Sequence, residues 1–98
     1  MGNMLKDLLV QELSELTKVE LWRVHWCLSQ DLLQNFPPHF LSLWSDPIPV
    51  SRLESADRTR TVDLMVQQYH AEGAKAVTEE ILRRMNKNQL ADRLMRNS

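Results

Sequence analysis

Apolar residues recur every three or four positions on both sides of a proline-rich stretch, and this period constrains the fold most strongly. Leu5, Leu9, Leu13 and Leu16 follow it near the N-terminus, as one apolar face of a helix requires. The same period returns in the second half of the chain, from Val62 onwards. No stretch alternates with a period of two for long enough to form a strand. The sequence therefore predicts an all-α domain.

The apolar faces of these helices define the expected core. It comprises Leu9, Leu13, Leu16, Leu21, Val24, Leu28, Val62, Met65, Val66, Val77, Ile81 and Leu90.

Helix boundaries are signalled by capping residues. Thr17 is expected to cap the second helix, with Glu20 three residues later completing a capping box. Later boundaries are expected at Asp57 or Thr59, at a joint around Gly73, and at Asn86 or Asn88.

A proline-rich connection interrupts the helical pattern. Each of its four prolines prevents a normal helix interior, and the segment His39–Asp46 between the two pairs has room for a turn or two of helix. Its apolar side chains permit three interpretations: a short helix that folds back onto the core, a protrusion that binds a partner or membrane surface, or a mobile segment. The prolines are Pro37, Pro38, Pro47 and Pro49.

Composition bounds the class of protein. The chain has 98 residues, which fits one domain over 1–98 with a core from about residue 4 to residue 95. Its 12 basic and 13 acidic side chains nearly cancel, so no bulk attraction for nucleic acid or anionic lipid is expected. No apolar run suits a membrane span. The single cysteine, Cys27, indicates an intracellular, reducing compartment.

The sequence offers no arrangement for catalysis, for a metal or for a cofactor. His25 and Cys27 are two positions apart and would point in nearly opposite directions on a helix. No nucleophile has an evident base beside it, and two glycines cannot build a phosphate-cradling loop. We therefore expect a non-enzymatic protein.

Three segments resemble the pyrin domain, a branch of the death-fold superfamily. Leu13–Leu28 is similar to the family's junction between its first two helices, and Ile48–Val66 to the start of its fourth helix, with IPVSRLESADRTRTVDLMV here. Ala74–Leu94 resembles the family's last two helices. The resemblance implies a six-helix antiparallel bundle whose third helix is short or irregular within the lengthened, proline-rich connection.

The resemblance also implies function. Pyrin domains bind other pyrin domains and form filaments, and similar domains head inflammasome sensors of the NLR type in the cytoplasm. The expected partners are an inflammasome adaptor and further copies of this chain, with a face of the first and fourth helices meeting a face of the second and third. The expected contact residues are Asp7, Gln11, Trp22, Arg23, Asp57, Arg58, Arg60 and Asp63.

The chain departs from the family pattern in its second helix and in the connection that follows. Val24 replaces the usual large aromatic residue, Trp22 and Cys27 stand where polar residues are common, and His39–Asp46 lengthens the connection. The basic face is thereby reduced to Arg23, with Trp22 as an exposed anchor, while Trp26 is expected to pack in the core.

Three alternatives remain open at this point. The charged positions are also compatible with an ordinary solvated helix surface, and the altered second helix with an inhibitory decoy that caps filaments. The third is nucleic-acid binding through a C-terminal basic cluster, comprising Arg83, Arg84, Lys87, Arg93 and Arg96.

Overall fold

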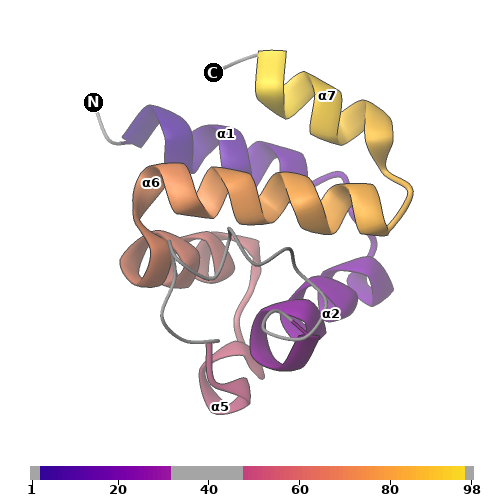
Figure 1. Ribbon diagram of the computed structural model, residues 1–98. Helices are drawn as coiled ribbons and strands as arrows, with labels where there is room; N and C mark the ends of the chain where they lie inside the picture. Colours follow the sequence, from indigo (N-terminus) through magenta and orange to yellow (C-terminus); the bar gives the residue numbers. More distant parts are fainter. Residues whose placement is uncertain (1–2, 32–47, 97–98) are drawn as a thin grey trace.

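The computed structural model describes residues 3–31 and 48–96, and all regular structure in these ranges is helical (Figure 1). The all-α prediction is therefore confirmed. A π-helical turn, η1 (Cys27–Asp31), continues directly from the second helix. The α-helices are α1 (Asn3–Leu13), α2 (Lys18–Trp26), α5 (Val50–Leu53), α6 (Arg58–Arg84) and α7 (Asn88–Arg96).

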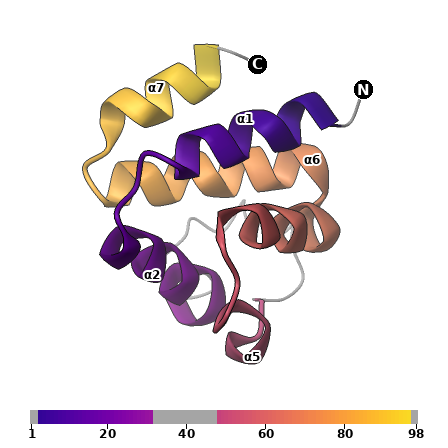
Figure 2. The same ribbon diagram turned by 180° about the vertical axis from the view of Figure 1, so that it is seen from behind.

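The long helix α6 is the element on which the others are arranged. Helices α1 and α7 both pack on it and touch each other, and the three lie side by side in both views (Figures 1 and 2). Helix α2 packs against η1, α5 and α6. Helices α2 and α5 thus occupy the end of the molecule away from α7 (Figure 2).

Helix α6 contains a break, so it corresponds to two of the six expected helices. His70 has φ 65° and ψ 177°, which is not helical. The joint expected at Gly73 is therefore misplaced by three residues, and Gly73 is buried inside the helix. The described ranges hold five α-helices, or six helical stretches when α6 is divided at His70. The short third helix expected in His39–Asp46 lies outside the described residues.

The core is a single apolar cluster contributed by all five helices, by η1 and by Ile48. Val24 is only 2% exposed although it is smaller than the aromatic residue of the family pattern. Val66 and Leu90 are partly buried and pack against the cluster. The other expected core residues are buried: Leu9, Leu13, Leu16, Leu21, Leu28, Val62, Met65, Val77 and Ile81.

The sequence-based helix caps are found where the structure describes them. The Thr17 hydroxyl accepts from Glu20 N at 3.1 Å, and Thr17 N donates to Glu20 Oε1 at 2.9 Å, which completes the capping box. The Asp57 carboxylate caps α6 by accepting from Arg60 N at 2.8 Å. Asn86, at φ 62°, follows α6 in the left-handed conformation that asparagine tolerates.

Arg58 joins the start of α6 to the end of α1. Its Nε donates to the Leu13 carbonyl at 2.8 Å and its Nη2 to the Leu16 carbonyl at 2.5 Å. These carbonyls belong to the last turn of α1 and the bend after it, where the Leu13 carbonyl also accepts from Leu16 N at 3.0 Å. The charged donor adds a hydrogen bond to each carbonyl and sets where α1 ends against α6.

A buried ion pair joins α7 to α1. Glu12 is 1% exposed, and its carboxylate accepts from Arg93 Nε and Nη2 at 3.0 and 3.2 Å. Arg93 also pairs with Glu15. The two parallel hydrogen bonds compensate for removing the Glu12 charge from water.

His70→Gly is expected to raise the free energy of unfolding by about 1 kcal/mol. A non-glycine residue in this region of φ and ψ is strained by roughly 1–3 kcal/mol, which exceeds the entropy cost of roughly 0.5–1 kcal/mol that glycine adds. The matched control is Gln67→Gly, at an exposed helical position of α6, which should destabilise by about 1 kcal/mol. Urea denaturation followed by circular dichroism measures both, and two losses of equal size would contradict the strain at His70.

Arg93→Met is expected to lower the free energy of unfolding by about 2–3 kcal/mol, because Glu12 keeps its burial and loses its cation. The loss is smaller than for a fully buried pair, since the Arg93 side chain is 42% exposed. Arg96→Met, at the exposed end of α7, is the control and should change stability little. The double variant Glu12→Leu/Arg93→Met should recover most of the lost stability. If it does not, the unpaired Glu12 carboxylate is not the cause of the destabilisation.

Candidate protein-interaction surfaces

Four of the expected contact residues lie on α1 and α6, which pack side by side. Asp7 and Gln11 are exposed and four residues apart on α1. Asp63 of α6 is half-buried and pairs with Lys6 of α1 at 3.3 Å, while Arg60 is exposed one turn before it. We call Asp7, Gln11, Arg60 and Asp63 the α1–α6 face.

Asp57 and Arg58, at the start of α6, have structural roles. Asp57 is exposed and caps the helix. Arg58 was expected to contact a partner, but its guanidinium donates to two carbonyls near the end of α1. We therefore leave Arg58 out of the α1–α6 face, because moving it toward a partner would break both hydrogen bonds.

The other expected contact residues, Trp22 and Arg23, lie on α2. Trp22 is 63% exposed and Trp26 is 43% exposed. The expectation that Trp26 packs in the core is wrong: Leu21, Val24 and Leu28 already form the buried stripe of this segment, and the two indoles occupy the neighbouring stripe. Trp22 and Trp26, which we call the tryptophan ridge, form an apolar projection with Arg23 exposed beside it.

Sequence reasoning missed two apolar side chains near this ridge. Val19 is 69% exposed and lies one turn before Trp22 on α2, and Val50 of α5 is 48% exposed. The spacing of Val19, Trp22 and Trp26, at three and four residues, was the available signal. This second apolar stripe makes the exposed side of α2 unusually apolar.

A hollow lies on either side of the tryptophan ridge, and the two differ in charge. The first, which we call the α5 pocket, has a volume of about 160 Å³, and the ridge, His25, Val50 and Glu54 contribute to its wall. The second, with a volume of about 460 Å³, is lined by the ridge together with Arg23 and Arg84. The two indoles thus separate an acidic hollow from a basic one.

His25 connects α2 to the start of α6 beneath the ridge. Its Nε2 lies 2.8 Å from Thr61 Oγ1, and that hydroxyl donates to the Asp57 carbonyl at 2.7 Å. Because the Thr61 hydrogen is used in this way, the imidazole Nε2–H is the donor to Thr61. Burial lowers the pKa of His25, because the charged imidazolium is poorly solvated there.

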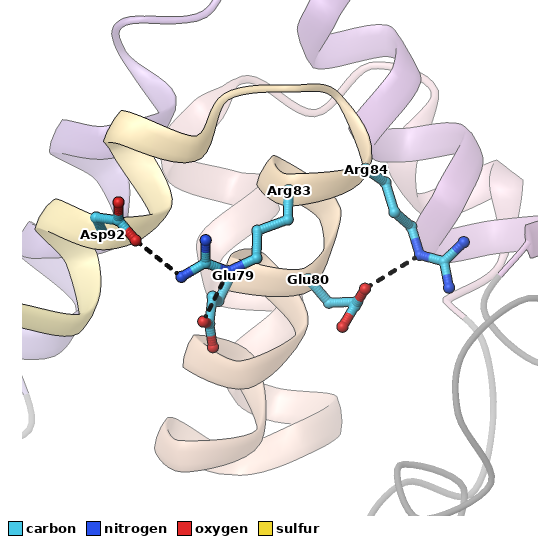
Figure 3. A network of polar contacts seen from close by, with 5 residues as sticks. All are labelled: Glu79, Glu80, Arg83, Arg84 and Asp92. Carbon is cyan, nitrogen blue, oxygen red and sulfur yellow. Dashed lines mark hydrogen bonds and ion pairs between the residues drawn. The ribbon is translucent and has the colours of Figure 1, made fainter.

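Four of the five residues of the C-terminal basic cluster are engaged in ion pairs with other described residues. Arg83 contacts Glu79 at 3.0 Å and Asp92 of α7 at 3.0 Å, and Arg84 contacts Glu80 at 3.4 Å (Figure 3). The neighbouring carboxylates raise the pKa of Arg83. Lys87 pairs with Glu20, as Arg93 does with Glu12 and Glu15. A cluster neutralised in this way is a poor phosphate-binding surface, so nucleic-acid binding loses its structural support.

The described part of the chain has no metal-binding cluster and no membrane-spanning helix. Residues 3–31 and 48–96 contain no group of three metal-ligating side chains, and Cys27 is buried. None of the helices in these ranges is sufficiently long and apolar to cross a bilayer.

The sequence matches a known family and part of one curated protein. The sequence model of the PAAD/DAPIN/Pyrin domain family matches residues 7–92. Caspase b of Danio rerio is 46% identical over 52 residues, a stretch that covers 53% of this chain and 13% of the caspase. The similarity to the caspase is therefore confined to a small part of that protein.

The stability of the domain is expected to fall as the pH drops below about 6.5, through His25. Burial lowers its folded-state pKa below the ordinary value for histidine, so the unfolded chain takes up the proton first. The neutral, buried imidazole contributes its full stabilisation above the pKa of the unfolded state. This contribution falls as the pH drops below that value, and it stops falling below the pKa of the folded state. Urea denaturation at steps from pH 7.5 to pH 5 measures how the free energy of unfolding changes with pH. The slope of this dependence should be shallower for His25→Gln. Equal slopes for the two proteins would contradict this assignment.

Proposed function

Because the chain belongs to the PAAD/DAPIN/Pyrin domain family, whose members are interaction modules, we propose that it nucleates or recruits pyrin-domain filaments in inflammasome signalling. The observation that carries the proposal is the pair of unlike surfaces on one small domain: the α1–α6 face and the tryptophan ridge with Arg23. Two different surfaces that fit each other give a head-to-tail contact, which does not close and can propagate.

The expected partners are further copies of this chain and an adaptor with a similar domain, in the cytoplasm. The similarity to Caspase b supports a place in signalling that ends in a caspase. The match spans only 13% of that protein, so its whole-protein activity is not carried over to this chain.

The charges and the ridge contribute unequally to the proposed contact. An exposed ion pair contributes roughly 0.2–1 kcal/mol, and Asp63 already shares its charge with Lys6. A tryptophan buries roughly 150–250 Å², so covering the 63% of Trp22 that is exposed would contribute about 2–4 kcal/mol. Charge therefore orients the two copies, and the ridge supplies most of the affinity.

Trp22→Ala is expected to weaken self-association by about thirtyfold, and Arg23→Ala by less than about fivefold. Static light scattering against protein concentration at 50 and 300 mM salt measures both. Salt should weaken the self-association of the wild-type protein by screening the charged pairs. The Asp7→Asn variant should show a smaller dependence on salt. Glu72→Gln, at an exposed α6 position away from these residues, is the control. A protein that stays monomeric at all concentrations would contradict the proposal.

The altered α2 surface supports one alternative, a decoy that binds a partner domain and stops further growth. In the seeded assembly of a filament-forming pyrin domain, a nucleator shortens the lag, whereas a decoy lowers the final amount of polymer. A lower yield without a shorter lag would replace the nucleating role with the inhibitory one.

A further inference from the structure

The α5 pocket has the chemistry of a site for a cation. Indoles of the tryptophan ridge form part of its wall, and Glu54 of the α5 C-cap is its single acidic residue. Val50 adds apolar surface. In the described part of the chain Glu54 is exposed and forms no ion pair, so its carboxylate is available to a partner.

The other polar residues of the pocket leave this charge uncompensated. His25 is neutral near pH 7, because burial lowers its pKa and its Nε2–H is directed to Thr61. Ser29 is uncharged, and its hydroxyl is 3.3 Å from the Trp26 carbonyl. Arg23 and Arg84 line the hollow on the other side of the ridge. A cation is therefore favoured in the α5 pocket, and an anion is disfavoured.

Size and shape favour an arginine over other cations. A volume of about 160 Å³ is close to that of a cavity which holds benzene, roughly 150 Å³, and a planar guanidinium is of similar size. Guanidinium groups stack on indoles and pair with carboxylates through two parallel hydrogen bonds, whereas the lysine ammonium is a compact, strongly hydrated charge. The attraction of a cation to an exposed indole contributes roughly 0.5–1 kcal/mol, and more when water is excluded.

We propose that the α5 pocket receives an arginine side chain of a partner domain, with its guanidinium against the tryptophan ridge and paired with Glu54. This inference rests on the proposed function, because it names what the α2 and α5 surface recognises in another domain. It gives the ridge two kinds of neighbour: an arginine of the partner on the α5 side, and acidic groups on the side of Arg23.

The test uses a small probe on the monomeric protein, so that it is independent of assembly. Acetyl-arginine amide is titrated at pH 7 while the indole N–H resonances of Trp22 and Trp26 are followed by NMR. Acetyl-citrulline amide, which has a nearly identical shape and no charge, is the matched probe. Glu54→Gln removes the carboxylate of the pocket, and Glu72→Gln removes an exposed carboxylate elsewhere.

We expect saturable shifts of both indole resonances with the arginine probe, and binding of the citrulline probe at least about tenfold weaker. Glu54→Gln should weaken arginine binding by about fivefold, and Glu72→Gln should leave it unchanged. Equal responses to the two probes, or no effect of Glu54→Gln, would overturn the proposal. So would binding to phosphatidylcholine vesicles with no response to arginine, since that would assign the ridge to a lipid surface.

The result separates the two proposals. If the protein binds the arginine probe but never assembles, the result supports the arginine pocket and contradicts the proposed function. If it assembles but does not respond to arginine, the result supports the proposed function and contradicts the arginine pocket.

Discussion

The hydrogen bonds from Arg58 to the Leu13 and Leu16 carbonyls are the constraint on which the arrangement of both surfaces depends. They fix the end of α1 against the start of α6, and Lys6 and Asp63 join the same two helices nearer the start of α1. The chain then turns directly into α2 through the Thr17 cap. One guanidinium thus sets the register of the α1–α6 face and the point from which the tryptophan ridge departs.

The two surfaces are held by different means. The α1–α6 face lies on helices whose apolar sides pack into the core, and the pair between the buried Glu12 and Arg93 adds α7 to them. The ridge stands on α2, which contacts α6 through His25 and Thr61. Its indoles have no core position to occupy, because smaller side chains already fill the space beneath α2. Their exposure follows from the packing and leaves apolar surface for a partner.

Much of the fold could be predicted from the sequence, because helical period and caps are local signals. The Thr17 capping box and the Asp57 cap are examples. A break in the long helix could be expected near Gly73, but its position could not, since glycine usually marks such a joint and here a strained His70 forms it. The role of Arg58 depends on residues more than 40 positions away. Glu12 lies beside the leucine stripe, which is a sign of burial. Its pairing with Arg93 could not be predicted, because that residue is 81 positions away and is brought close only by the tertiary fold. The contact residues were expected in two groups and that expectation remains a prediction, while the exposure of Trp26 depended on how α2 packs.

Complementation between two defective variants tests the central claim, a head-to-tail contact between unlike surfaces, most directly. One variant carries Asp7→Arg and Asp63→Arg in the α1–α6 face, and the other carries Trp22→Ala and Arg23→Glu on α2. Each retains one intact surface, so each should sediment as a monomer alone, while their equimolar mixture should form a 1:1 complex that grows no further. Analytical ultracentrifugation measures all three samples. A mixture that remains monomeric, or a single variant that still assembles, would contradict the account.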